Sequence, residues 1–274
     1  PIGETIGDSR LQGVVFINDR FYISGSNNRE PQIYVLNREG ELVNQYPQFV
    51  DGAYGIRDMT FDGEWIWGSV YNTIYAFTPE GELMREFDGP FNPNNNFAWD
   101  SDRELLWVSS TTSDLVAIDR QGNQVLSLRR RGLRTYGLCY YPEDQDGYPL
   151  YFFHKDPDLA DQVITKMDPE TNDTMFVSVL DPEGGGNPSG SFCSNQYDPQ
   201  RWVFICVINN GPNDRMEIWQ IEDRFEWFEL APAEGIVNAG ESEELVLTLD
   251  ATGIPIGFRF EIEMVFHHNA IGGE

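Results

Sequence analysis

Short runs of aromatic and β-branched residues alternate with turn residues along the first part of the chain. Residues 19–42 (DRFYISGSNNREPQIYVLNREGEL) and 62–83 (DGEWIWGSVYNTIYAFTPEGEL) follow the same order of aromatic run, turn, aromatic run and EGEL. Neither segment shows the sustained period of about 3.6 residues that marks an amphipathic helix. The pattern therefore predicts a succession of short β-strands.

The strand pattern repeats at a fixed interval. Gly40, Gly81 and Gly122 occupy the same column of the alignment, each 41 residues after the one before. A fourth copy is read at 164–167 with the turn DPETN, and a fifth at 218–221 with EDRFE. The last two copies are more widely spaced because HKDPDLADQ and NNGPNDR lengthen the preceding loops, and loops tolerate insertions better than strands.

A repeat of about 40 to 45 residues with four strands is typical of a β-propeller blade. We therefore predict an all-β fold, a β-propeller of about five four-stranded blades between Leu11 and Glu222, with six blades as the alternative. Because propellers usually close by pairing both ends of the chain in one blade, residues 1–9 are expected to supply an outer strand. The predicted propeller domain is 1–223.

The pattern changes after Arg224. Phe258, Phe260, Ile262, Met264 and Phe266 alternate with polar residues, which predicts an antiparallel sandwich segment in a second domain, 224–274. The segment is shorter than the roughly 100 residues of a complete immunoglobulin-like sandwich, so the expected module is partial. The chain is then either a fragment of a longer protein or a subunit whose open edge receives a strand from a neighbour.

Motifs in both predicted domains carry a resemblance. The tail motif WFELAPAEG at 227–235 with DATG at 250–253 resembles immunoglobulin-like modules of secreted bacterial proteins, especially in Bacteroidota. The repeat motifs YGIRDMTFDG at 54–63 and SDLVAIDRQGN at 113–123 resemble the propellers that precede such modules in proteins exported by type IX secretion. The resemblance implies a secreted, cell-surface protein, and it is specific for architecture and weak for activity.

Charge narrows the choice of partners. The chain has 45 acidic and 18 basic residues, a formal net charge of −27, which disfavours binding to nucleic acid. No apolar run reaches the roughly 18 residues of a membrane-spanning helix, so no membrane insertion is expected. The first residue is Pro1, which favours a processed exported chain or an excised fragment and an extracellular location.

Cysteine content argues against a disulfide framework. Cys139, Cys193 and Cys206 are few and odd in number, and no metal-ligand spacing joins them. We expect buried apolar side chains, with a Cys193–Cys206 bridge across a hairpin as the alternative.

Candidate ligand-binding residues lie in the loops that surround the central channel of a propeller. Asparagine, arginine and aromatic rings suit a carbohydrate or peptide ligand, whereas the alternative is packing between blades and turn formation. The candidates are Tyr54, Arg57, Asp58, Asn94, Asn95, Asn96 and Tyr136.

Evidence for catalysis or a cofactor is weak in the sequence. A glycosidase needs two or three carboxylates that converge on the channel, one of them a general acid. Only Asp58 and Asp100 lie near the predicted inner strands, which argues against hydrolysis, and no enzyme is expected. No cofactor is expected either, although a calcium site is weighed against a solvated acidic loop. The candidate Ca²⁺ ligands are Asp156, Asp158 and Asp161.

The sequence alone thus favours a non-catalytic extracellular binding or scaffold module. The expected partner is a protein or glycan held on the loop face of the propeller. A structural subunit that assembles into a filament or surface layer through the sandwich edge is the alternative. A lactonase or lyase similar to the SMP-30 family comes third.

Overall fold

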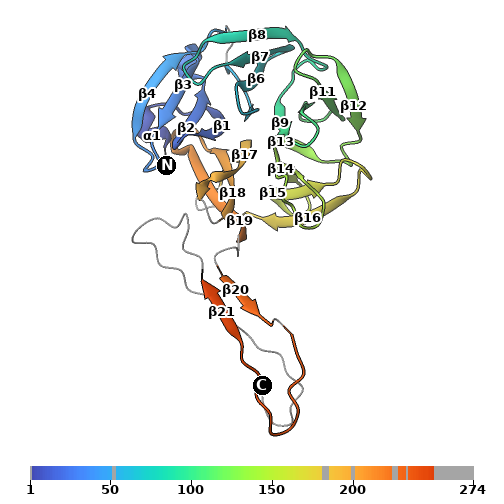
Figure 1. The fold of residues 1–274 in the computed structure, drawn as a ribbon. Coiled ribbons are helices and arrows are strands. Elements are labelled where there is room, and N and C mark those ends of the chain that lie inside the picture. Colours follow the sequence, from blue (N-terminus) through green and yellow to red (C-terminus); the bar gives the residue numbers. More distant parts are fainter. Residues whose placement is uncertain are drawn as a thin grey trace. The chain divides into compact units, whose positions relative to one another are not determined.

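The computed structural model describes residues 2–50, 54–180, 185–198, 201–223, 228–232 and 234–249. The chain divides into two compact units, Pro1–Asp223 and Arg224–Glu274. The first unit is a five-bladed β-propeller, which confirms the predicted all-β class and the count of five blades (Figure 1).

The five blades follow one another along the chain, and each consists of neighbouring antiparallel strands. Blade 1 contains β1 (Leu11–Ile17), β2 (Arg20–Gly25), β3 (Gln32–Leu36) and β4 (Leu42–Pro47). Blade 2 contains β5 (Met59–Phe61), β6 (Ile66–Val70), β7 (Thr73–Phe77) and β8 (Leu83–Asp88). Blade 3 contains β9 (Asn96–Asp100), β10 (Leu105–Ser109), β11 (Leu115–Ile118) and β12 (Gln124–Leu128).

The last two blades differ in their number of strands. Blade 4 contains β13 (Arg134–Tyr140), β14 (Leu150–Asp156), β15 (Ala160–Met167) and β16 (Thr174–Val179). Blade 5 contains β17 (Asn187–Asp198), β18 (Arg201–Asn209) and β19 (Arg215–Asp223). Within the described residues blade 5 is a three-stranded sheet, whereas the other four blades have four strands each.

The aligned glycines of the first three repeats occupy the same turn in their blades. Gly40, Gly81 and Gly122 have φ values of 83°, 89° and 89°, a region that residues with a Cβ rarely adopt. Each follows the third strand of its blade, and its N–H donates to the carbonyl three residues earlier. A Cβ on Gly81 would meet the Tyr46 ring at 2.7 Å, and one on Gly122 would meet Phe87 at 2.7 Å. In blades 2 and 3 the turn therefore packs on an aromatic ring of the preceding blade's outer strand, whereas no atom lies within 4 Å of the Cβ position of Gly40.

The ring closes between blades 5 and 1 through a buried aspartate. Asp214 Oδ2 accepts hydrogen bonds from the Leu11 N–H at 2.8 Å and from Asn209 Nδ2 at 3.1 Å. Apolar residues of β18 also pack against β1 and β2 in one core cluster. The expectation that residues 1–9 form an outer strand is wrong. Gly3–Ile6 form the short helix α1, and the Gly3 N–H donates to the Asp214 carbonyl at 3.0 Å.

An aspartate at the end of the first strand holds a tryptophan of the second strand in two blades. Trp67 Nε1 donates to Asp62 Oδ2 at 2.9 Å in blade 2, and Trp107 Nε1 donates to Asp100 Oδ2 at 3.0 Å in blade 3. Both indole rings are fully buried. Asp100 therefore serves to hold the blade together, and it does not line the pocket described below.

We expect Trp107→Phe to lower the free energy of unfolding by about 2 kcal/mol, because the smaller ring leaves a void and Asp100 loses a buried donor. Urea denaturation measures the loss. Trp219→Phe is the matched control, since the Trp219 indole donates to Glu217 at an exposed site. Equal losses in the two variants would contradict the role of the buried hydrogen bond.

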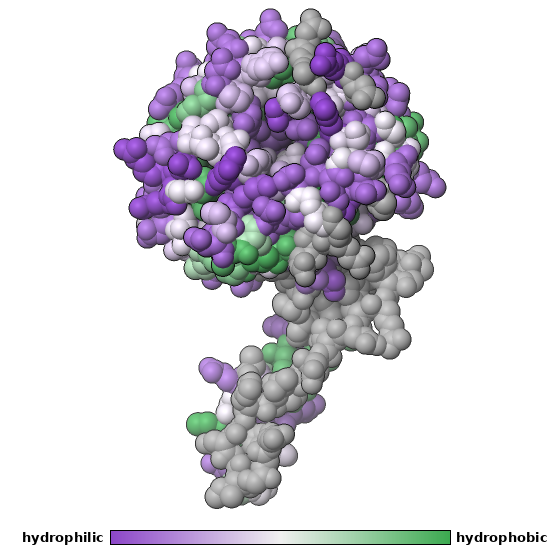
Figure 2. Space-filling view, turned by 180° about the vertical axis from the view of Figure 1, so that it is seen from behind, coloured by the Kyte–Doolittle hydropathy of each residue, from purple (hydrophilic) through white to green (hydrophobic). Residues whose placement is uncertain are grey.

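The surface of the propeller reflects the acidic composition. Figure 2 shows one face of the molecule, on which hydrophilic residues predominate over the described part. No helix among the described residues is long and apolar enough to cross a membrane.

The second unit contributes one described strand pair, β20 (Phe228–Ala231) with β21 (Val246–Leu249), paired antiparallel. Two strands do not make an immunoglobulin-like sandwich, so that prediction is not shown by this part of the chain. Its main pattern, the alternating residues 258–266, lies outside the described residues.

Candidate functional site

The inner strands of the five blades bring one residue each to the propeller axis. Three of these five residues are glycines. The five residues, in blade order, are Gly13, Asp58, Asn96, Gly137 and Gly190. Asp58 is thus the one carboxyl among five positions at the centre of the ring.

The carboxyl of Asp58 binds the peptide groups of three other blades. Its Oδ2 accepts hydrogen bonds from the N–H of Phe97 at 3.1 Å and of Leu138 at 2.9 Å. Its Oδ1 accepts one from the N–H of Ser191 at 3.0 Å. Burial raises the pKa of Asp58 well above its ordinary value, although the peptide N–H groups act in the opposite direction.

The absence of side chains at the neighbouring positions makes room for this carboxyl. A Cβ on Gly190 would lie 2.6 Å from Asp58 Oδ1 and 2.6 Å from the Gly13 Cα. A Cβ on Gly137 would lie 2.5 Å from the Ser189 carbonyl oxygen. The glycines therefore allow the inner strands to approach one another closely around Asp58.

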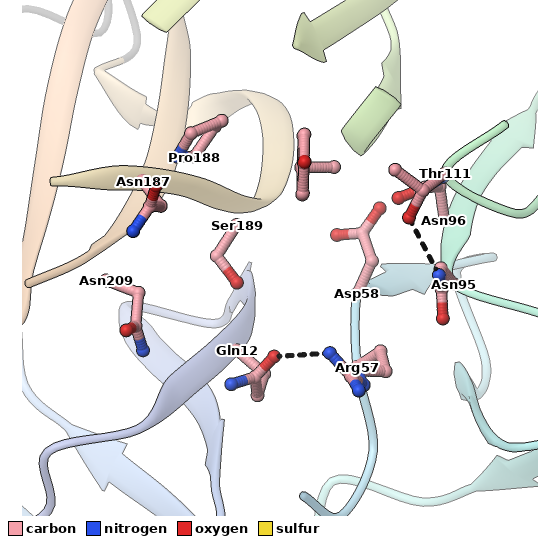
Figure 3. Close-up of a pocket in the computed structure, with 11 residues that line it drawn as sticks. Gln12, Arg57, Asp58, Asn95, Asn96, Thr111, Asn187, Pro188, Ser189 and Asn209 are labelled. Atoms are coloured by element: carbon pink, nitrogen blue, oxygen red, sulfur yellow. Dashed lines mark hydrogen bonds between the residues drawn. The ribbon is translucent and has the colours of Figure 1, made fainter. Parts of the chain in front are cut away.

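A pocket of about 210 Å³ lies beside Asp58. Figure 3 shows that the lining side chains come from several strands around the axis, with Ser189 across from the segment that carries Arg57 and Asp58. Most of the lining residues are polar and uncharged. The lining consists of Gln12, Arg57, Asp58, Asn95, Asn96, Thr111, Tyr136, Asn187, Pro188, Ser189 and Asn209.

Arg57 is the one basic residue of the lining. Its guanidinium lies 4.5 Å from the centre of the Tyr54 ring, and Nη1 donates to Gln12 Oε1 at 3.4 Å. No carboxylate of the described residues forms an ion pair with it. Burial lowers the pKa of Arg57, but the guanidinium remains charged at neutral pH. Arg57 is therefore available to an oxygen atom of a ligand.

Two asparagines of the lining present hydrogen-bond acceptors. The buried Oδ1 atoms of Asn95 and Asn96 accept no hydrogen bond from the described residues. Their Nδ2 atoms are engaged, since Asn95 donates to Thr111 Oγ1 and Asn96 to Ser109 Oγ, both at 3.0 Å. This orientation leaves the two amide oxygens as sites for N–H groups of a ligand.

The structure brings five of the seven candidate ligand-binding residues into the pocket lining. They are Arg57, Asp58, Asn95, Asn96 and Tyr136. Tyr54 is 44% exposed and contacts the pocket only through Arg57.

Asn94 is the candidate that the structure places away from the pocket. Its side chain is buried, donates to the Asn72 carbonyl at 2.9 Å and accepts from the Phe91 N–H at 2.9 Å. Asn94 is held away from the pocket because its side-chain amide forms hydrogen bonds with the backbone of its own loop and of the neighbouring turn.

The candidate calcium ligands are not gathered into one site. Asp161 Oδ1 lies 3.2 Å from Lys155 Nζ, and Asp156 Oδ1 accepts the Asp158 N–H at 2.9 Å within the loop. No group of three potential metal ligands occurs within the part of the chain that the structure describes.

Sequence reasoning missed several lining residues. Gln12 and Ser189 each directly precede the central residue of their blade, as Arg57 does. Thr111 follows β10 by two residues, and Asn209 is the last residue of β18. An alignment of all five copies by their central residue would have found Gln12 and Ser189, since both precede the glycine of that column.

Comparisons with known proteins bear on the fold. No protein-family model and no curated protein matches the chain. Among solved structures, the crystal structure of Myxococcus xanthus glutaminyl cyclase matches with a TM-score of 0.52 and 13% sequence identity. The match covers 78% of this chain and 93% of the other. At this identity the likeness shows a shared fold.

The comparison corrects the functional expectation. A non-catalytic binding or scaffold module was predicted largely because few carboxylates reach the inner strands. The matching protein is an enzyme on the same type of propeller, so the prediction of a non-catalytic binding or scaffold module is contradicted. The error arose from requiring several converging carboxylates, whereas some reactions need only one acidic group and well-placed amides.

Proposed function

We propose that the protein is an enzyme whose reaction takes place in the axial pocket, on the N-terminal glutaminyl residue of a peptide. The reaction would be the one named by its structural neighbour, closure of the glutaminyl residue with release of ammonia. The observation that carries the proposal is the pair of free acceptor oxygens on Asn95 and Asn96 beside the carboxyl of Asp58.

The size of the pocket supports a terminal residue as substrate. Its 210 Å³ is below the roughly 300 to 1,000 Å³ of sites that enclose drug-sized ligands. One amino-acid residue fits this volume, with the rest of the peptide outside. The net charge of −27 also favours the approach of a positively charged amino terminus over that of an anion.

The polar groups match the atoms of the reaction. The α-amino nitrogen forms a bond to the γ-carbonyl carbon, and the bond from that carbon to the amide nitrogen breaks. One proton passes from the attacking nitrogen to the leaving ammonia. Arg57 donates to the γ-carbonyl oxygen as negative charge develops on it. The amide oxygens of Asn95 and Asn96 accept hydrogen bonds from the N–H groups of the substrate. Asp58 takes the proton from the attacking α-amino nitrogen and passes a proton to the leaving ammonia.

We also propose that the enzyme acts outside the cell, on peptides or proteins with N-terminal glutamine. The resemblance of the motifs at 54–63 and 113–123 to exported propellers supports this location. The resemblance of the tail motifs at 227–235 and 250–253 supports an immunoglobulin-like second unit, as predicted for residues 224–274.

Incubation of the full chain with a short peptide that begins with glutamine tests the activity. We expect ammonia release and a matching mass loss in the peptide, and no reaction with the N-acetylated peptide, which has no free amine. Arg57→Gln should lower kcat/KM about 100-fold, because one donor to the developing charge is lost.

Arg29→Gln is the matched control, because Arg29 is exposed and lies outside the pocket lining. It should leave the rate unchanged. If the folded wild-type protein releases no ammonia above the rate of the peptide alone, the proposed function is wrong.

A further inference from the structure

Two cysteines of different blades lie in direct contact inside the propeller. Cys139 belongs to β13 of blade 4 and Cys193 to β17 of blade 5, and their Sγ atoms are 2.7 Å apart. Both side chains are buried in the same apolar cluster. Cys139 pairs with Tyr151 and Cys193 with Phe204 within their own sheets, so the sulfur contact joins the two blades.

Both cysteines are free thiols in the structure. Their separation is shorter than the about 3.5–4.0 Å of non-bonded heavy atoms and longer than the about 2.05 Å of a disulfide bond, so a small shift of the two side chains brings the sulfur atoms to bonding distance. We propose that Cys139 and Cys193 form a disulfide that links blade 4 to blade 5. The expected alternative bridge, Cys193–Cys206, is not favoured, because Cys206 lies opposite Ser191 in the ladder of β17 and β18.

The bond requires an oxidant, and a small-molecule disulfide of the glutathione class supplies it. One cysteine thiolate attacks the small disulfide and releases one thiol. The second cysteine then attacks the mixed disulfide, the sulfur–sulfur bond forms, and a second thiol leaves. Burial raises the pKa of the Cys139 thiol in the folded protein, so the reaction belongs to the stage before the two blades close together.

The link lies next to the central carboxyl. Leu138, whose N–H binds Asp58 Oδ2, directly precedes Cys139, and Ser191, whose N–H binds Asp58 Oδ1, is two residues before Cys193. A covalent bond here fixes the spacing of two strands that position Asp58. The disulfide therefore stabilises both the seam between the blades and the floor of the pocket.

The first test counts thiols in the full wild-type chain. The protein is refolded with oxidised glutathione, unfolded without reductant and titrated with a thiol reagent. We expect one free thiol per chain, at Cys206, and a Cys139–Cys193 cross-linked peptide in the mass spectrum of the unreduced digest. Three free thiols, or a cross-link that includes Cys206, would overturn the proposal.

The second test distinguishes the stabilisation due to the disulfide bond from that due to the packing of the two cysteine side chains. Reductant should lower the thermal midpoint of the wild-type protein and of Cys206→Ala by a similar number of degrees. It should leave the midpoint of Cys139→Ala unchanged. Should Cys139→Ala fail to fold, the thiol count and the cross-linked peptide of the wild-type protein still decide the matter. A reductant effect of equal size in Cys139→Ala would count against the disulfide.

Discussion

Asp58→Ala should lower the free energy of unfolding by about 3 to 6 kcal/mol, the largest loss expected for a single change in the propeller. Removal of the carboxyl leaves the N–H groups of Phe97, Leu138 and Ser191 buried without an acceptor. Each buried unpaired donor costs about 1 to 3 kcal/mol. Because the free energy of unfolding of a domain is about 5 to 15 kcal/mol, the variant should be close to unfolding at room temperature.

Urea denaturation of the purified variant measures this loss, and Asp119→Ala is the control. Asp119 also accepts three hydrogen bonds, from Gln121 N, Asn123 N and Asn123 Nδ2, but in a turn at the surface. Water replaces a lost acceptor there, so the control should be far less affected. Similar losses of unfolding free energy in both variants would show that the buried hydrogen bonds of Asp58 stabilise the fold no more than those of an exposed turn.

Gly190→Ala is the second change for which we expect a large effect, a loss of about 3 kcal/mol together with loss of the proposed activity. The added methyl group would lie 2.6 Å from Asp58 Oδ1 and 2.6 Å from the Gly13 Cα. One of these neighbours is backbone, which cannot rotate away as a flexible side chain can. The inner strands of blades 5 and 1 must therefore move apart, and the carboxyl must shift.

The control for Gly190 is Gly235→Ala. No atom lies within 4 Å of the position that its Cβ would take, and its backbone does not have a positive φ. Thermal unfolding of the two variants, followed by circular dichroism, compares crowding with the general effect of replacing a glycine. A thermal midpoint of Gly190→Ala close to the wild-type value would mean that the inner strands around the axis can move apart without a loss of stability.

The number of blades could be predicted from the sequence because the repeat has a fixed column. The positive φ of Gly40, Gly81 and Gly122 is a local requirement that the first three copies meet in the same place. That the described residues of blade 5 form three strands, where the other blades have four, could not be predicted in this way. The closing contacts come from the side chain of Asp214 and from helix α1, and neither has a counterpart in the other copies.

The candidate site was only partly visible in the sequence for a similar reason. Arg57, Asp58 and Asn95 have side chains whose chemistry suggests binding. The partners of Asp58, however, are peptide N–H groups of residues 39, 80 and 133 positions away, which no side-chain pattern reveals. The expected absence of catalysis followed from counting carboxylates. Such a count cannot show how burial changes the one carboxyl at the axis.

The hydrogen bond between Asp58 and Ser191 also has a consequence for the order of folding. Its two residues are 133 positions apart, so the carboxyl finds its last partner only after blade 5 has been synthesised. Until blade 5 is in place, Asp58 lacks its Ser191 donor, and the pocket lacks the lining residues Asn187, Ser189 and Asn209. The axial pocket is therefore completed only in the final step of assembly of the ring.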